Sequence, residues 1–131
     1  MIDIHNHLLP EVDDGAKSQS ETLEIIKTAE EYEIHKIVAT PHYMEESYQI
    51  EGETIEKKVR ELNELLNKKD INVEILAGHE IYITPDLIKK FKNKDILSIN
   101  NSKYLLLEMP MNYIPEYLDQ VFYDLSVLGY K

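Results

Sequence analysis

Segments typical of strands and of helices alternate four times along the 131 residues, and this alternation restricts the fold more than any other feature. Strands are expected at residues 1–7, 37–39, 73–76 and 104–107, and helices at 18–33, 53–69, 85–91 and 115–128. Strands that alternate with helices are typical of βαβ units with a parallel sheet. We therefore expect an α/β fold of (βα) repeats with parallel strands, and an irregular loop at residues 43–52.

Local signals mark the ends of the expected helices. Ser18 and Glu21 form a capping box at the start of the first helix. Pro85 and Pro115 are placed to begin the third and fourth helices, and Gly129 is placed to end the fourth. The second helix carries one apolar stripe at helical spacing, formed by Ile55, Val59, Leu62 and Leu66.

The amino-terminal strand carries a His-x-His pair. Side chains two residues apart on a strand point to the same face, so Asp3, His5 and His7 share one side. Two imidazoles on one face can bind one divalent transition-metal ion, although a polar strand face without a metal has the same pattern. Asp3 is placed to accept the N–H of a ligating ring and so to fix its tautomer.

Metal-capable side chains also follow each of the other three expected strands. His42, Glu80 and Glu108 lie at or just past the carboxyl ends of these strands. Active sites assemble at this end of parallel α/β sheets, so we expect the three residues to converge with His5 and His7. Three imidazoles and two carboxylates suit zinc, manganese or iron(II), and carboxylates can bridge two ions.

Other polar residues lie near these positions in the sequence. Asp13 and Asp14 precede Gly15 in a turn-rich loop. Hydrogen bonds within the turn are their expected role, and a contact to the metal ligands or to a substrate is the alternative. We expect His79 to point away from the site and His35 to lie on the surface.

Composition excludes several classes of function. The formal net charge of −11 argues against nucleic acid or an anionic membrane surface as the main partner. The chain has no cysteine, which removes disulfides, thiolate metal sites and cysteine nucleophiles. No segment is typical of a signal peptide or a membrane span, so a cytoplasmic protein without membrane insertion is expected.

Five blocks together closely resemble the PHP (polymerase and histidinol phosphatase) superfamily. They are His5-Asn6-His7, the loop at residues 9–15, Ala39-Thr40-Pro41-His42, Gly78-His79-Glu80 and the block at residues 102–108. Within that superfamily the chain resembles the manganese-dependent protein-tyrosine phosphatases of Gram-positive capsule and exopolysaccharide operons.

The resemblance implies a distorted TIM-like barrel with a trinuclear metal cluster. Residues 1–131 would form a single PHP-type domain that is roughly the first half of this barrel and incomplete at its carboxyl end. By motif match the metal ligands are His5, His7, His42, Glu80 and Glu108. Mn²⁺ is the implied ion, with Fe, Zn, Co or Mg as other divalent choices.

The implied reaction is hydrolysis of phosphotyrosine on a bacterial tyrosine kinase that governs polysaccharide synthesis. A metal-bound hydroxide is the expected nucleophile, and Asp14 is the candidate side chain for a catalytic role beside it. A first alternative is a PHP phosphoesterase that acts on a small phosphate such as histidinol phosphate. A second alternative is an inactive amino-terminal fragment that binds metal or only self-associates. The family has phosphate-clamping arginines, whereas Arg60 is this chain's one arginine. The lack of matching arginines favours this second alternative.

Overall fold

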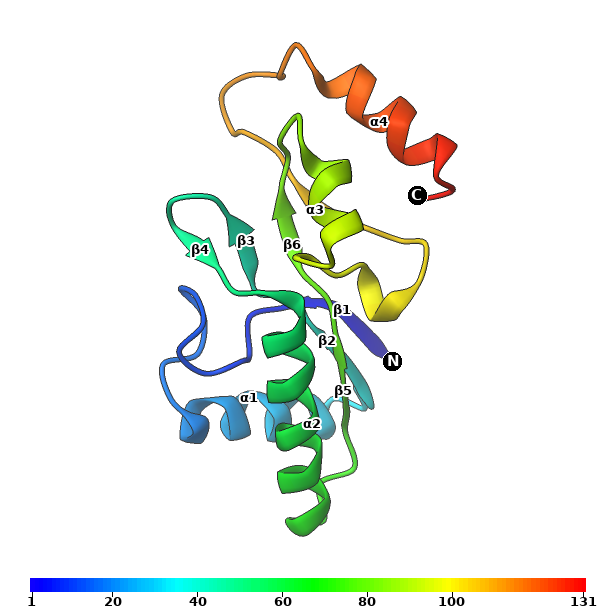
Figure 1. Cartoon of the computed structure of the whole chain (residues 1–131). Helices are drawn as coiled ribbons and strands as arrows, with labels where there is room; N and C mark the ends of the chain where they lie inside the picture. The colour runs from blue at the N-terminus through cyan, green and yellow to red at the C-terminus, as the bar shows by residue number, and fades with distance from the viewer.

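The computed structural model describes residues 1–131 and arranges the strands in two small sheets (Figure 1). The first sheet is parallel and has the order β1-β2-β5, which are Ile2–Asn6, Lys36–Ala39 and Glu74–Ala77. The second sheet has the order β4-β3-β6-β7, which are Tyr48–Gln49, His42–Met44, Glu80–Tyr82 and Leu106–Glu108. Only the β3–β4 pair is antiparallel. The expected α/β class with parallel strands is confirmed.

The second sheet continues the first after short breaks in the chain. β2 leads into β3 through Thr40 and Pro41, and β5 leads into β6 through Gly78 and His79. Pro41 has no N–H to give to a ladder, so regular pairing stops there. Backbone bonds still bridge the break, because Gly78 N donates to Ala39 O at 3.0 Å and Glu80 N donates to Pro41 O at 3.1 Å. His42 and Glu80 therefore begin new strands.

The prediction of an irregular loop at residues 43–52 was wrong. Met44 pairs with Tyr48 and Tyr43 with Gln49, so this segment is a short β-hairpin. Tyrosines suit a strand, but the tight turn between them places Glu46 at a φ of 66°. A non-glycine residue rarely adopts this left-handed conformation, so composition did not indicate the turn.

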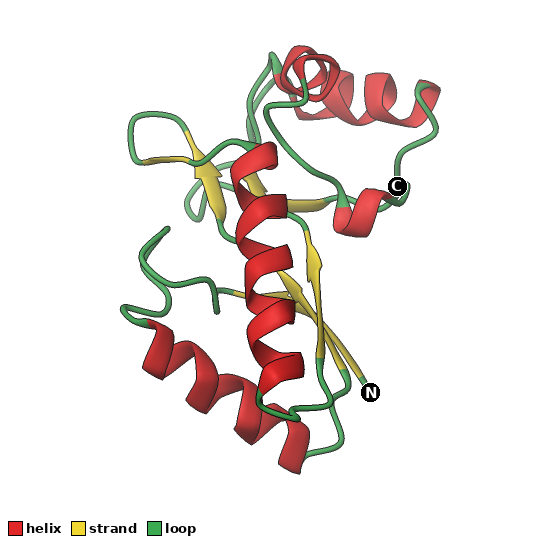
Figure 2. Cartoon of the chain, turned by 60° about the horizontal axis from the view of Figure 1, so that its bottom comes forward, coloured by secondary structure: helices red, strands yellow, loops and turns green.

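Three α-helices and one 3₁₀ turn lie between the strands, and a fourth α-helix follows the last strand (Figures 1 and 2). They are α1 (Gln19–Glu31), α2 (Gly52–Lys68), α3 (Leu87–Asn93), η1 (Ile99–Asn101) and α4 (Leu118–Val127). The Ser18 side chain accepts the Glu21 N–H at 3.2 Å, as the capping box predicted. α3 and α4 begin two and three residues later than predicted, because Pro85 and Pro115 lie in turns that precede them. Gly129 follows α4 with a φ of 81°, as expected of a stop residue.

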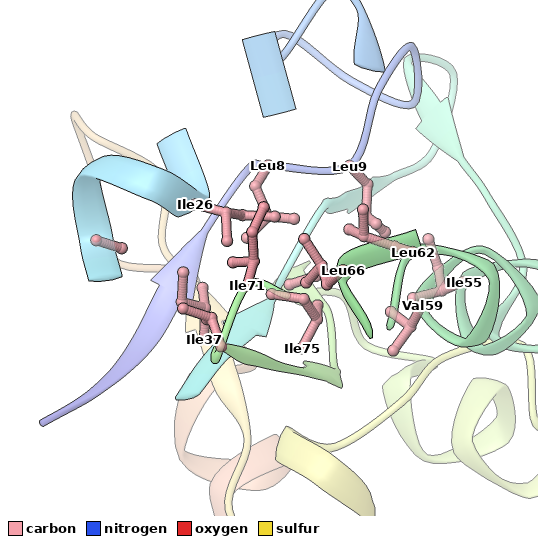
Figure 3. Close-up of a cluster of buried hydrophobic side chains, with 13 residues drawn as sticks. Leu8, Leu9, Ile26, Ile37, Ile55, Val59, Leu62, Leu66, Ile71 and Ile75 are labelled. Atoms are coloured by element: carbon pink, nitrogen blue, oxygen red, sulfur yellow. The ribbon is translucent and has the colours of Figure 1, made fainter. Parts of the chain in front are cut away.

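Two apolar clusters form the core. The larger one packs α1 and α2 on the first sheet around residues such as Leu8, Ile26, Ile55, Leu66 and Ile75, all at most 1% exposed (Figure 3). The predicted stripe of α2 faces into this cluster. The smaller cluster lies among β6, α3 and α4 and contains Ile81, Ile83, Leu87, Ile96, Val121 and Leu125. No helix is long and apolar enough to cross a membrane.

Candidate metal centre

The metal-capable side chains predicted from the sequence converge on one edge of the two sheets. His5 is near the end of β1 and His7 follows it, whereas His42 and Glu80 are paired first residues of neighbouring strands. Glu80 also pairs with Leu106, so Glu108 lies one side-chain step further along the same face. Its carboxylate reaches back to within 3.3 Å of His42 Nδ1.

Three donor atoms, from β1, from the residue after it and from β6, form a nearly equilateral triangle. His5 Nε2 and His7 Nε2 are 3.1 Å apart, and each lies 3.1 Å from Glu80 Oε2. Ligands that share an ion through bonds of about 2.1 Å at right angles lie about 3 Å apart. The triangle therefore has the spacing of three ligands of one metal ion.

A second group shares the same oxygen of Glu80. His42 Nδ1 lies 3.3 Å from Glu80 Oε2 and 3.3 Å from Glu108 Oε2. Both His42 Nδ1 and Glu108 Oε2 are buried and have no hydrogen-bond partner. Buried polar atoms are normally paired, so this pair of atoms fits a bound cation. A carboxylate between two groups of donors is also the usual bridge between two ions.

Asp14 belongs to a third group with His7 and His42. Its Oδ1 lies 3.5 Å from His42 Nε2, and its side chain is 64% exposed. Each of the three groups keeps its donor atoms within 4.8 Å of one another. The arrangement accommodates more than one divalent ion, with His7, His42 and Glu80 common to two groups each.

Asp13 holds the histidines of this centre in place, a role that the sequence analysis offered only as the alternative. His7 Nδ1–H donates to Asp13 Oδ2 at 2.7 Å, because a carboxylate can only accept. This hydrogen bond raises the pKa of His7. Burial opposes ionisation of Asp13, but hydrogen bonds from His7 and from the backbone N–H groups of Gly15 and His42 lower its pKa. In the neutral ring, His7 Nε2 is then left free to bind a metal.

The prediction that Asp3 orients an imidazole was wrong. Its Oδ1 accepts the backbone N–H of His5 at 3.1 Å, and its Oδ2 accepts the Asn6 side-chain amide at 2.9 Å. Asp3 shares the expected face, but nearer donors at the strand end occupy both oxygens. The turn hydrogen bond expected of Asp13 is present, because its Oδ1 accepts from Gly15 N. The contact to His7 that was the alternative role for Asp13 is present as well.

Gly15 allows the Asp13 loop to close on His7. A Cβ at Gly15 would lie 2.1 Å from His7 O and 2.5 Å from His7 Cβ, so no side chain fits there. Ala16 N then donates to His7 O at 3.0 Å. The Asp-Asp-Gly order thus places a carboxylate, a second acidic residue and a close backbone contact beside the same histidine.

His79 and His35 lie outside the centre, as predicted. His79 is fully buried and bonded on both sides: Nε2–H donates to Ile50 O, and Nδ1 accepts from Leu97 N, both at 3.0 Å. Burial lowers the pKa of His79 to about 4. His79 therefore fastens the start of α2 to the loop after α3, and His35 is exposed.

The β3–β4 hairpin covers one side of the centre. The Tyr48 ring stacks on His42 with centroids 5.7 Å apart and planes at 18°. Lys90 on α3 anchors the hairpin. Its Nζ lies 2.7 Å from Oε1 of Glu45 in the hairpin turn and 3.1 Å from Oδ1 of Asp86 at the start of α3. Burial opposes the charge on Lys90, but these hydrogen bonds raise its pKa. The only sequence signal for the hairpin was its pair of tyrosines.

The whole chain matches one protein family. Residues 1–131 match the family described as capsular polysaccharide synthesis, CpsB/CapC. CapC of Staphylococcus aureus is 44% identical over 130 residues, which are 99% of this chain and 51% of that protein. The tyrosine-protein phosphatase YwqE of Bacillus subtilis is 38% identical over 130 residues, again 99% of this chain and 51% of the relative. The chain thus spans about half the length of the curated relatives it matches.

A solved structure is similar over nearly the whole chain. It comes from crystal structures of YwqE from Bacillus subtilis and CpsB from Streptococcus pneumoniae, described as metal-dependent tyrosine phosphatases. The TM-score is 0.94 at 38% identity, and the match covers 99% of this chain and 53% of that one. The family match, the relatives and the shared fold lead to one conclusion: the chain belongs to the CpsB/CapC family of capsular polysaccharide synthesis proteins.

Proposed function

We propose that this chain supplies the metal-binding part of a metal-dependent phosphatase that hydrolyses phosphotyrosine on proteins. The observation that carries the proposal is the pair of donor groups joined at Glu80 Oε2, with buried His42 Nδ1 and Glu108 Oε2 left without hydrogen-bond partners. Relatives named as tyrosine-protein phosphatases support the substrate. The proposed partner is a bacterial tyrosine kinase of polysaccharide synthesis, and the proposed location is the cytoplasm.

In this proposal the residues that hold metal are His5, His7, His42, Glu80 and Glu108, with Mn²⁺ as the ion. Bound divalent ions supply an activated water nucleophile and neutralise charge on the phosphoryl oxygens. The chain's other side chains orient the proposed ligands and pack against them. Asp13 fixes the ring of His7, and Tyr48 covers one face of His42 against water. Asp14 is 64% exposed and lies 3.5 Å from His42 Nε2, and it is the proposed side chain for a catalytic role.

One observation favours the alternative in which the chain alone binds metal without turnover. Arg60 is the one arginine, and it lies exposed on α2, whereas the metal-capable side chains come from strand ends. The described residues therefore bring no guanidinium to the centre to hold a phosphate bidentately. Phosphate binding in this chain then depends on the ions themselves.

Self-association is part of the proposal. β1 is an edge strand of its sheet, and Ile2 and Ile4 on it are 58% and 59% exposed. On α4, Tyr123 and Val127 are 65% and 67% exposed. An unpaired strand edge and exposed apolar side chains favour pairing with a second chain. Light scattering after size exclusion tests self-association. A chain that stays monomeric at a concentration on the order of 100 µM would contradict this part of the proposal.

The test of the main proposal measures metal and activity on one sample. The chain is purified with Mn²⁺, its metal content is determined by mass spectrometry, and hydrolysis of a phosphotyrosine peptide and of histidinol phosphate is compared. His42→Ala removes one proposed ligand. His35→Ala is the matched control, because His35 is exposed and lies outside the centre.

Each result has a distinct meaning. Bound metal with phosphotyrosine turnover, lost in His42→Ala and kept in His35→Ala, supports the proposal. Turnover of histidinol phosphate alone would support the small-phosphate alternative. Bound metal without turnover would leave this chain with the metal-binding role only. A folded chain that binds no metal would overturn the assignment.

A further inference from the structure

A small apolar cavity shares one wall with the candidate metal centre. The cavity has a volume of about 350 Å³, and Glu108 is its acidic lining residue. The Glu108 carboxylate also lies 3.3 Å from His42 Nδ1. The side chain of Glu108 therefore borders both the candidate metal centre and this cavity.

Strand register explains why the cavity begins where the donor atoms end. His42 pairs with Glu80, and Tyr82 pairs with Glu108. Met44 and Tyr82 each lie two residues beyond a proposed ligand on the same strand, so they point to the same face. The floor of the cavity is thus the next row of side chains along the strands.

The lining is suited to an aromatic ring. Besides Met44 and Tyr82, the loop after β7 contributes Met109, Pro110, Met111, Asn112 and Tyr113. Thioethers adapt to a flat ring and make favourable sulfur–aromatic contacts, and tyrosines stack on it. Ligand pockets usually have volumes of about 300–1,000 Å³, so this cavity suits one ring rather than an extended ligand.

We propose that this cavity is the subsite for the aromatic ring of an aryl phosphate, with the phosphoryl group at the metal centre beside Glu108. The inference rests on the proposed function and adds a reason for choosing phosphotyrosine over alkyl phosphates. An alkyl phosphate fills the phosphoryl position equally well but leaves the Met44–Tyr82 floor uncovered. The cavity therefore sets specificity by burying the ring that carries the phosphate.

The test compares two stable phosphonates, phenylphosphonate and methylphosphonate, on the full chain loaded with Zn²⁺ as a diamagnetic ion. The chain has four methionines, and Met44, Met109 and Met111 line the cavity, whereas Met1 does not. Methyl-labelled methionine gives one NMR signal for each, assigned by single Met→Leu variants. Met1, 78% exposed at the chain start, is the internal control.

Burial of a phenyl ring predicts about tenfold tighter binding of phenylphosphonate. Its ring current should move the signals of the partly buried Met44 and Met109 and leave Met1 unmoved. Equal affinity for both phosphonates with unmoved methionine signals would overturn the subsite and leave the proposed function intact. Binding of neither phosphonate would overturn the proposed function and the subsite with it.

Variants provide a second readout. Tyr113 is 62% exposed at the cavity rim, so Tyr113→Ser should keep the fold while it lowers the preference for the phenyl compound about threefold. Affinity for methylphosphonate should stay unchanged. Tyr32→Ser is the matched control, because Tyr32 is an exposed tyrosine at the carboxyl end of α1 and does not line the cavity. An unchanged preference in Tyr113→Ser and in Met44→Ala would contradict the proposal.

Discussion

His7 Nδ1 and Asp13 Oδ2 lie 2.7 Å apart, and the same oxygen accepts the backbone N–H of His42 at 3.0 Å. His7 follows a strand of the first sheet, and His42 begins a strand of the second. One carboxylate on a loop therefore fixes two proposed ligands that come from different sheets. The relative position of these two imidazoles depends on Asp13 as much as on the strands themselves.

Replacing Asp13 by Asn should weaken metal binding more than its mild chemistry suggests. Asp13 accepts from His7, Gly15 and His42, and an amide offers only one accepting oxygen, so its NH₂ would face a donor. Loss of such a partner typically lowers metal affinity 10–100-fold, which is about the loss expected here. Competition with a fluorescent chelator for Mn²⁺ measures it.

The control for this measurement is Asp70→Asn. Asp70 lies in the turn after α2 with a φ of 54°, a conformation that Asn tolerates. It is exposed and remote from the strand ends. Equal Mn²⁺ affinity in the Asp13 and Asp70 variants would show that Asp13 does not position His7.

Gly15→Ala should disturb the same loop through sterics alone. Its Cβ would lie 2.1 Å from His7 O, so either the loop or His7 must move. Overpacking of this kind costs about 1–3 kcal/mol in the free energy of unfolding. Urea unfolding measures the loss. Gly129→Ala is the contrast, because nothing lies within 4 Å of its Cβ and only the strain of its φ of 81° remains. A smaller loss at Gly15 than at Gly129 would be inconsistent with this account.

The convergence of the five proposed ligands was predictable because it depends on the regular part of the fold. His5 and Glu108 lie near the ends of β1 and β7, and His42 and Glu80 begin β3 and β6 just past the ends of β2 and β5. The ends of parallel strands meet at one edge of a sheet whatever the loops do. Strand pairing also fixes which neighbours share a face. The sequence periodicity contains both kinds of information, so the convergence of these side chains could be predicted without coordinates.

The loop contacts were not predictable, because no periodicity governs them. Asp13 reaches His7 only because Glu11 takes a φ of 58° and Gly15 packs on His7. The hairpin that brings Tyr48 onto His42 depends likewise on Glu46 at a φ of 66°. Left-handed glutamates are uncommon, so turn rules based on Gly, Asn or Pro do not find them.

Glu80→Gln should remove most of the stabilisation that Mn²⁺ gives. Glu80 Oε2 is common to the His5–His7 group and to the group with Glu108. At 100 times its dissociation constant, a bound ion raises the free energy of unfolding by about 2.7 kcal/mol, and we expect little of this to remain. Glu108→Gln should lose less, because it belongs to one group only. Urea unfolding with Mn²⁺ and with EDTA measures both, and equal losses in the two variants would contradict a shared Glu80.

Unfolding below neutral pH should depend on His79. Burial lowers its pKa to about 4 in the folded chain, whereas the unfolded side chain has the ordinary value of 6.5. The unfolded state therefore binds more protons between these values, and the free energy of unfolding falls as pH is lowered from 6.5 to 4. At 1.36 kcal/mol per pKa unit, this residue accounts for a loss of about 3 kcal/mol over the whole range.

The comparison that isolates His79 is wild type against His79→Gln, both in EDTA, by urea unfolding from pH 7 to pH 4.5. The other four histidines are the same in both chains, so their contributions cancel in the difference. A Gln amide can donate to Ile50 O and accept from Leu97 N as His79 does, so the fold is expected to persist. The stability of wild type should then fall more steeply than that of the variant as pH drops. Parallel curves would mean that the pKa of His79 is the same in the folded and unfolded chains, and that burial does not lower it.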